Sequence, residues 1–254
     1  MKWLREQASA GCTERSFLLS GSPGTVPGIL WSPAAPARPA LVLLFHGGSG
    51  HKRCGRHLRM GRWLASAGLA AAAIDGPFHG DRVPAPLAAS VYQQLIADEG
   101  IERVTARMTQ DWLEAVSALA RQGLADEADV SIFGMSMGAR FAIPVTAALG
   151  TRVRCAVFGK FGVRQAGGLH AGLCAPGLIV EAARAISAPV LYFVQWDDEL
   201  FPRDGQLELF GALASADKHL IARPGPHAHT HPDDEAAWRA FIRLHTTGPH
   251  PASS

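Results

Sequence analysis

The 254-residue sequence lacks the features that mark several classes of protein. No long apolar core follows its first residues, as it would in a secretory signal peptide, and no uninterrupted apolar stretch is long enough to span a bilayer. The formal net charge is only +2, and no concentrated basic run is present. We therefore expect neither a membrane nor a nucleic acid as a partner.

Cysteine pairs of the CxxC kind are also absent. The four cysteines are scattered along the chain at Cys12, Cys54, Cys155 and Cys174. Such spacing favours free thiols in a reducing compartment, so we expect a cytoplasmic protein. The arginines cluster once, at positions 53, 56, 59 and 62, where helical spacing predicts the solvated face of a helix.

Apolar runs of strand length alternate with segments of helical periodicity. The strands are predicted at residues 40–45, 69–74, 130–133, 153–158, 189–195 and 218–222, and the main helices at 60–67, 104–119, 207–213 and 233–244. This alternation predicts an α/β fold with a mostly parallel, doubly wound sheet of the eight-stranded type, flanked by helices on both faces. A proline at 144 predicts that the helix after residue 136 kinks or ends early.

No internal repeat or long linker divides the chain, so residues 1–254 are expected to form a single domain. Residues 1–35 are predicted to supply antiparallel edge strands, and residues 246–254 a flexible tail. In a parallel sheet of this kind, ligands bind outside the carboxyl ends of the strands. The residues that directly follow each strand are therefore the candidates for function.

A Gly-x-Ser-x-Gly pattern follows the strand at 130–133. It reads Gly134-Met135-Ser136-Met137-Gly138. In a nucleophile elbow the serine sits at a sharp turn between strand and helix, and the two glycines let these elements approach closely. A strand followed by an ordinary glycine-rich turn is the alternative, and the context must decide between them.

The strand at 40–45 is followed by a glycine-rich loop, His46-Gly47-Gly48-Ser49-Gly50. Glycines let backbone amides point into a cavity, as the stabilisation of a developing oxyanion requires. A phosphate-binding loop is less well supported, because neither G-x-G-x-x-G nor a Gly-Lys-Ser/Thr sequence is present. A second loop, residues 75–82, follows the next strand, and its His79 is expected to be structural.

Three adjacent acids, Asp197, Asp198 and Glu199, follow the strand at 189–195. One carboxylate here could orient a histidine, and Asp198 is the first choice with Asp197 second. A cap for the following helix is the alternative.

Three alternate histidines, His227, His229 and His231, follow the last strand. His227 lies closest to the strand end and is the candidate general base. The H-x-H spacing leaves a metal-dependent hydrolase open as an alternative, although no second ligand cluster accompanies it.

The order Ser136, Asp198, His227 is that of the α/β-hydrolases, and the chain resembles that superfamily from about Gly28 to Leu244. Within that superfamily it is similar to the small dienelactone-hydrolase-like esterases, whose D-x-x-x-P segment matches Asp198 and Pro202. The resemblance implies that the backbone amides of Gly48 and Met137 form the oxyanion hole. Dienelactone hydrolases proper use a cysteine where this chain has Ser136, which weakens the transfer of their lactone substrate.

The resemblance implies a serine hydrolase that cleaves a small carboxylic ester, thioester or lactone through an acyl-enzyme, without metal or organic cofactor. Only residues 160–187 separate the strands where many relatives insert a lid, so we expect little or no lid. Acyl transfer on the same fold stays open, as does a catalytically silent binding protein. Arg82, Lys160 and Arg164 are candidates for recognising an anionic substrate, with solvated surface cations as the alternative. The chain is expected to be a monomer or a homodimer.

Overall fold

The structure, a computed structural model, describes residues 1–9, 11–20 and 24–246. The strands in these residues form one nine-stranded sheet in the order β1-β2-β3-β5-β4-β6-β7-β8-β9. Their bounds are β1 Lys2–Ser9, β2 Cys12–Ser20, β3 Thr25–Pro33, β4 Ala40–Phe45, β5 Ala70–Ile74, β6 Asp126–Met135, β7 Val153–Gly159, β8 Val190–Gln195 and β9 Lys218–Arg223.

Strand direction divides the sheet into two parts. The strands β1, β2 and β3 pair antiparallel at one edge, and β3 joins β5 in the same sense. From β5 to β9 every neighbouring pair is parallel. The carboxyl ends of β4, β6, β7, β8 and β9 therefore lie along one edge, as the predicted α/β fold requires.

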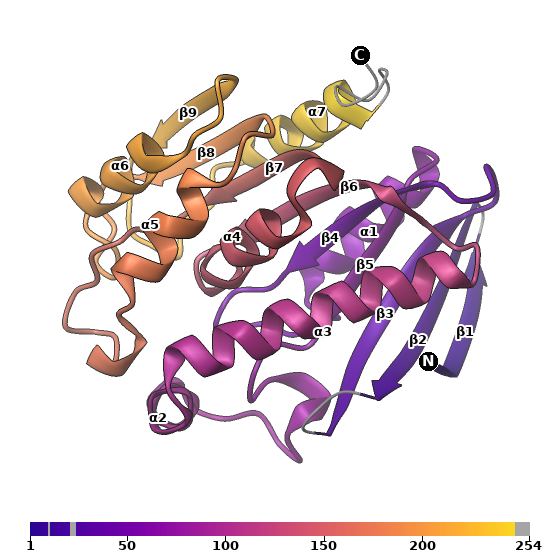
Figure 1. The fold of residues 1–254 in the computed structure, drawn as a ribbon, viewed down its shortest axis with the longest axis horizontal. Helices are drawn as coiled ribbons and strands as arrows, with labels where there is room; N and C mark the ends of the chain where they lie inside the picture. The colour runs from indigo at the N-terminus through magenta and orange to yellow at the C-terminus, as the bar shows by residue number, and fades with distance from the viewer. Residues whose placement is uncertain (10, 21–23, 247–254) are drawn as a thin grey trace.

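Helices cover both faces of the sheet (Figure 1). Their bounds are α1 Gly55–Ser66, α2 Ala89–Glu99, α3 Ile101–Arg121, α4 Met137–Leu149, α5 Pro176–Arg184, α6 Arg203–Ala212 and α7 Asp234–Thr246. The core on one face includes buried residues of α1 and α7, and the core on the other face includes residues of α2 to α6. Alternate residues of β4 divide between the two cores, which explains its uninterrupted apolar sequence.

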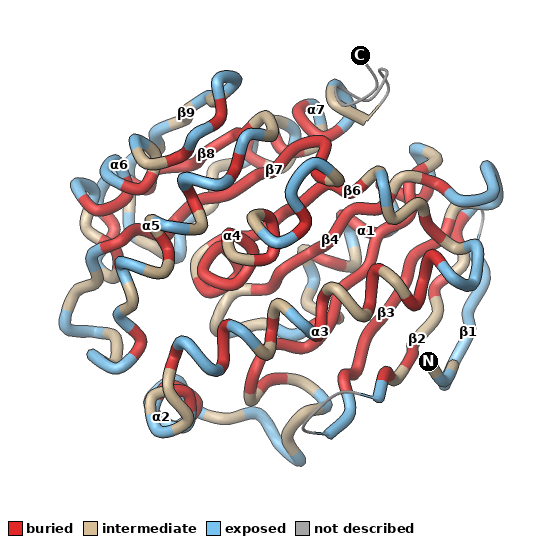
Figure 2. The backbone as a smooth tube through the Cα atoms, viewed as in Figure 1, coloured by how far each residue is buried: buried red, intermediate tan, exposed pale blue. Residues whose placement is uncertain are grey.

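Burial follows this layering. Figure 2 shows the central strands buried along most of their length, while β1 is mostly exposed. Edge strands were predicted within residues 1–35, but without bounds for β1, because its side chains are mainly polar or charged and it forms a strand by pairing with β2. The predicted tail at 246–254 lies outside the described residues except for Thr246, which ends α7.

The helix α4 does not end early at Pro144, as the sequence suggested it could. It continues to Leu149, and most of its residues are buried. A proline in a helix interior costs about 3 kcal/mol. Burial of the apolar side chains on both sides of Pro144 offsets this cost, because each contributes about 1.5–3 kcal/mol when fully removed from water.

None of the helices in the described ranges has both the length and the apolar character that a membrane span requires. The four cysteines all fall within the described residues and are all free thiols.

Candidate active site

Ser136 occupies the bend between β6 and α4. Its backbone has φ 59° and ψ −125°, in the left-handed half of conformational space. The flanking glycines meet close neighbours: an added Cβ would lie 2.7 Å from the Gly138 carbonyl oxygen at Gly134, and 2.5 Å from the Phe45 carbonyl oxygen at Gly138. A side chain at either glycine would push β6, β4 and α4 apart. The bend therefore has the form that the Gly-x-Ser-x-Gly pattern predicts.

The substitution Gly138→Ala is expected to lower the free energy of unfolding by about 1–3 kcal/mol, because its methyl group overlaps a backbone oxygen that cannot rotate away. Chemical denaturation measures this loss. The matched control is Gly211→Ala in α6, where an added Cβ meets nothing within 4 Å. Equal stabilities for the two variants would contradict the close approach at Gly138.

Three side chains predicted from different strand ends meet at this bend. The Ser136 Oγ lies 2.8 Å from His227 Nε2, and His227 Nδ1 lies 2.8 Å from Asp198 Oδ2. The Asp198 carboxylate needs a proton on Nδ1, so Nε2 is free to accept the Ser136 hydroxyl proton. The carboxylate is fully buried, while the His227 side chain is 15 % exposed. The serine thus has a base within hydrogen-bond reach and an acid behind that base.

Backbone amides fix the Asp198 carboxylate. Its Oδ1 accepts hydrogen bonds from the amides of Leu200, at 2.9 Å, and Phe201, at 2.8 Å. This leaves Oδ2 facing His227. The backbone amides therefore hold Oδ1, while the imidazole and the more distant Gln206 Nε2, at 3.5 Å, contact Oδ2, so the carboxylate cannot rotate without losing a bond.

The two neighbouring acids, Asp197 and Glu199, accept hydrogen bonds from the backbone of the loop that carries His227, here called the histidine loop, and not from its imidazole. Asp197 Oδ2 accepts the Gly225 amide and Glu199 Oε2 accepts the His227 amide, both at 2.8 Å. The hydrogen bond from His227 lowers the pKa of Glu199. Neither residue caps α6, whose N-terminal cap position is Pro202 without a side-chain hydrogen bond. Of the three acids, only Asp198 is placed to orient the imidazole.

Lys160 holds the same loop from the other side. Its Nζ donates to the carbonyl oxygens of His227, at 3.2 Å, and His229, and to Thr230 Oγ1 at 3.3 Å. Burial, with a smaller effect of nearby Arg56, lowers the pKa of Lys160 to about 8. Lys160 is therefore not a solvated surface cation. Its contacts hold the loop that carries His227.

The other two histidines of this loop turn to different partners. His229 Nδ1 lies 3.4 Å from the Pro224 carbonyl oxygen, and His231 Nδ1 lies 3.5 Å from Asp233. Within the described part of the chain, no group of three or more His, Cys, Asp or Glu side chains is placed to hold a metal ion. The geometry gives no support to a metal centre built on His227, His229 and His231.

The glycine-rich loop after β4 is braced by two imidazoles. His46 Nδ1 lies 2.8 Å from the Gly47 carbonyl oxygen, and His46 Nε2 accepts a hydrogen bond of 2.7 Å from the Gly76 amide. Burial, with a smaller effect of His79, lowers the pKa of His46 to about 4, so His46 is neutral and donates from Nδ1. His79 Nε2 lies 2.8 Å from the Gly48 carbonyl oxygen. His79 thus fixes the loop and does not contact Ser136.

A cavity of about 690 Å³ opens beside Ser136. Gly48 and Met137, the predicted oxyanion donors, both line it, and Met137 is the first residue of α4, where backbone amides have no partner within the helix. Their donor role stays a prediction. Among the described residues, the β7–β8 connection supplies Lys160, Gly168, Leu169 and Leu173 to the wall, in keeping with the small lid that was expected.

Several cavity residues were not among the predicted site residues. Tyr92 of α2 places its hydroxyl 2.3 Å from where a Cβ on Gly48 would lie. Arg56, expected on a solvated helix face, lines the cavity with its guanidinium 5.2 Å from the centre of the Trp238 ring. Arg140 also lines it, one helical turn after Ser136. The spacing of Arg140 from Ser136 was the available signal, because residues four apart share a helix face.

The remaining candidates for anion recognition are paired with acids. Arg82 makes a buried ion pair of 2.6 Å with Asp111. Arg164 is 59 % exposed and contacts Asp204 and Glu208. Neither residue lines the cavity beside Ser136.

A mostly parallel sheet that carries a serine at a strand–helix bend, with an acid and a histidine after later strands, defines an α/β-hydrolase. A family model, that of the dienelactone hydrolase family, matches residues 26–239, and the chain belongs to this family. It is a carboxylic ester hydrolase. A search among curated proteins found no match.

Solved structures similar to this chain are esterases and related hydrolases. A cold-adapted esterase from an Arctic intertidal metagenomic library, in a PEG-bound complex, is 31% identical, with 97% of this chain and 100% of that chain covered and a TM-score of 0.82. A putative dienelactone hydrolase from Klebsiella pneumoniae subsp. pneumoniae MGH 78578 is 20% identical, with 92% of this chain and 98% of that chain covered and a TM-score of 0.72. The acetyl xylan esterase from Paenibacillus sp. R4 is 17% identical, with 96% of this chain and 87% of that chain covered and a TM-score of 0.73. The last two share the fold.

Proposed function

We propose that the protein hydrolyses carboxylic esters, thioesters or lactones of small substrates through Ser136, His227 and Asp198 and a covalent acyl-enzyme. The observation that carries this proposal is the continuous hydrogen-bond path from Ser136 Oγ through His227 to Asp198, with both distances 2.8 Å. A serine hydroxyl is a weak nucleophile until a neighbouring base accepts its proton. Here the base is in contact with the hydroxyl, and a buried carboxylate orients the base.

In the first half of the reaction, the Ser136 oxygen attacks the carbonyl carbon while His227 Nε2 takes the hydroxyl proton. The carbonyl π bond becomes a lone pair on oxygen, which the amides of Gly48 and Met137 stabilise. The tetrahedral intermediate collapses, the bond to the alcohol or thiol breaks, and His227 returns its proton to the leaving group. Asp198 stabilises the imidazolium that exists between these two transfers.

In the second half, a water molecule enters beside His227. The imidazole takes one proton from the water as its oxygen attacks the acyl-enzyme, and then returns that proton to Ser136 as the acid leaves. The cavity and the small lid leave this path accessible. Nucleophile, base, acid and oxyanion donors all come from the chain, so the proposed reaction uses neither a metal ion nor an organic cofactor.

The proposed substrate is a small acyl compound, in keeping with a cavity of about 690 Å³. The free thiols support the proposal that the protein acts in the cytoplasm. We propose that it works as a monomer or homodimer, with neither nucleic acid nor a membrane as a partner.

Labelling with a fluorophosphonate probe tests the proposed nucleophile. We expect one probe per chain, with the adduct on the peptide that contains Ser136, because the probe reacts with a serine activated by a neighbouring base. Intact mass and peptide mapping measure the stoichiometry and the site. Ser49 also lines the cavity, so Ser49→Ala is the matched control and should still be labelled, whereas Ser136→Ala should not. An adduct retained by Ser136→Ala would overturn the proposal.

A further inference from the structure

The cavity beside Ser136 is lined by three cationic side chains. These are Arg56 from α1, Arg140 from α4 and Lys160 after β7, and no aspartate or glutamate is among the described residues that line it. The Asp198 carboxylate is fully buried against His227 and the Leu200 and Phe201 amides. An excess of positive charge therefore faces the space in which the substrate binds.

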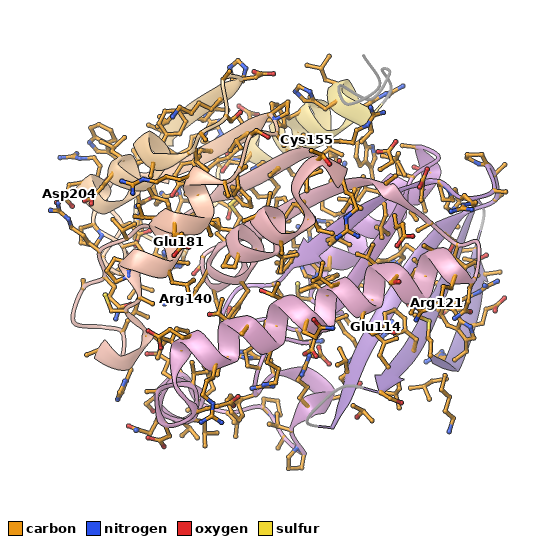
Figure 3. The ribbon with its side chains drawn as sticks, viewed as in Figure 1. Glu114, Arg121, Arg140, Cys155, Glu181 and Asp204 are labelled. Carbon is orange, nitrogen blue, oxygen red and sulfur yellow. The ribbon has the colours of Figure 1, made fainter. Side chains whose placement is uncertain are left out.

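Arg140 has no acidic partner among the described contacts, and its guanidinium is buried. Only 5 % of the residue is exposed, whereas Glu114 and Arg121 on α3 are exposed; Figure 3 shows Arg140 beside α4. Its guanidinium donates to the Leu173 carbonyl oxygen and to Gln165 Oε1, at 3.4 Å. The Phe161 and Phe201 rings lie 5.1 and 5.9 Å from it. All of these partners are neutral.

Two buried cations that do not line the cavity, in contrast, do have acids. Lys52 contacts Asp75 at 2.6 Å, and Arg82 contacts Asp111 at 2.6 Å. Among the described residues, no acid makes such a contact with Arg140, and burial lowers the pKa of its guanidinium only to about 10. The side chain is therefore charged at neutral pH. A buried, charged group without a counter-ion is costly, and that cost is recovered when an anion binds.

The other two cations are more fully engaged by the protein. Lys160 donates to the carbonyl oxygens of the histidine loop, and Arg56 lies over Trp238 and donates to Thr230 Oγ1 at 3.3 Å. A guanidinium has five donors in a fork that suits a carboxylate. The two hydrogen bonds described for Arg140 leave donor capacity for such a ligand.

Arg140 lies close to Ser136, the proposed nucleophile. The Arg140 amide bonds the Ser136 carbonyl oxygen at 3.1 Å, so the two residues lie about one helical turn, or roughly 5.4 Å, apart along α4. Phe201 packs against both Arg140 and the His227 ring, at 5.9 and 5.8 Å. An anion at the guanidinium would thus lie a few bonds from a carbonyl group bound at Ser136.

We propose that Arg140 binds a carboxylate on the acyl group of the substrate, so that the enzyme prefers half-esters of short dicarboxylic acids to neutral esters of the same length. This inference rests on the proposed function and adds a substrate class to it. A purely structural role for Arg140, tying residues 165–173 to α4, is the competing explanation.

Two substrates of equal acyl length separate these explanations. Monoethyl glutarate carries a carboxylate where ethyl valerate carries a methyl group, and ethanol release measures both. We expect kcat/KM of the wild-type enzyme to be at least about tenfold higher for the half-ester, in keeping with a charge-assisted pair. In Arg140→Met this ratio should fall by about tenfold or more. In Arg140→Lys, which keeps the charge, part of the ratio should remain.

The matched control is Arg164→Met, which removes an exposed arginine that does not line the cavity and should leave the ratio unchanged. An Arg140→Met enzyme that loses activity on both substrates equally would show a structural role and overturn the proposal. A wild-type preference for ethyl valerate would also overturn it, whether or not any Arg140 variant folds.

Binding to Ser136→Ala separates this proposal from the proposed reaction. Calorimetry should show that the variant binds monoethyl glutarate at least about tenfold more tightly than ethyl valerate. If the wild-type enzyme cleaves neither ester but this binding preference is found, the proposed reaction fails and the anion site stands. If cleavage is found without any binding preference, the anion site fails and the reaction stands.

Discussion

Ser136→Ala, His227→Ala and the double variant are expected to lose kcat to the same extent, by about 10⁶-fold on an activated ester, as in the serine protease series that measured such losses. The reason is that the Ser136 hydroxyl and the His227 imidazole share one proton, so removing either ends the same step. The residual rate comes from substrate binding and the oxyanion amides. Steady-state kinetics with 4-nitrophenyl butyrate, on variants with matched thermal stability, measures the three losses.

His229→Ala is the control for His227→Ala, because it removes a neighbouring imidazole that lies against the Pro224 carbonyl oxygen and not against Ser136. Its kcat should stay within a few fold of the wild-type value. An inactive His229→Ala enzyme would show that His227 is the wrong histidine for the role of base. A double variant far slower than either single variant would show that Ser136 and His227 act independently.

Asp198→Asn is expected to lower kcat by about 10⁴-fold, the loss found for the equivalent change in a serine protease. Here the structure supplies a specific reason. The Leu200 and Phe201 amides need an acceptor at the oxygen they contact, so the asparagine must keep its carbonyl oxygen there and turn its NH₂ group toward His227 Nδ1. The imidazole then carries its proton on Nε2 and cannot accept the proton of Ser136.

The neighbours of Asp198 give the comparison. Asp197→Asn and Glu199→Gln keep acceptors for the Gly225 and His227 amides, so each should cost no more than about tenfold in kcat, because only a charge-assisted hydrogen bond is weakened. The kcat values of the three variants, measured at one pH above the midpoint of the pH–activity profile, show which acid orients His227. A larger loss in Asp197→Asn than in Asp198→Asn would move the acid to position 197.

The parts of the site that the sequence predicted share one physical origin. Ser136, Asp198 and His227 each follow an apolar run, and such a run is a local signal for a buried strand. Parallel strands bring their carboxyl ends to one edge of the sheet. The proximity of three residues far apart in the sequence can therefore be predicted without knowing how their side chains pack. Asp198 and Asp197 were distinguished only through the resemblance to known hydrolases, and the Oδ2–Nδ1 contact at Asp198 agrees with that choice.

The cavity walls were harder to predict because they depend on how helices rotate and pack. The spacing of Arg56, Arg59 and Arg62 is that of a solvated helix face, yet the Arg56 guanidinium lies over the Trp238 ring of α7 and Arg56 lines the cavity. Tyr92 lies on α2, a helix of weak amphipathic character that the sequence did not predict. Tertiary contacts of this kind override local patterns, since each side chain responds to residues far along the chain.

The backbone of Ser136 has a consequence for the evolution of thermal stability in this enzyme. A residue other than glycine at φ 59° and ψ −125° typically costs about 1–3 kcal/mol, out of a net folding free energy of about 5–15 kcal/mol. Relaxing this bend would favour the folded state, but it would lower the hydroxyl away from His227. Selection for heat resistance and selection for turnover therefore oppose each other at this one residue. Lineages that adapt to heat must gain their stability elsewhere, in the two cores or along the exposed edge at β1.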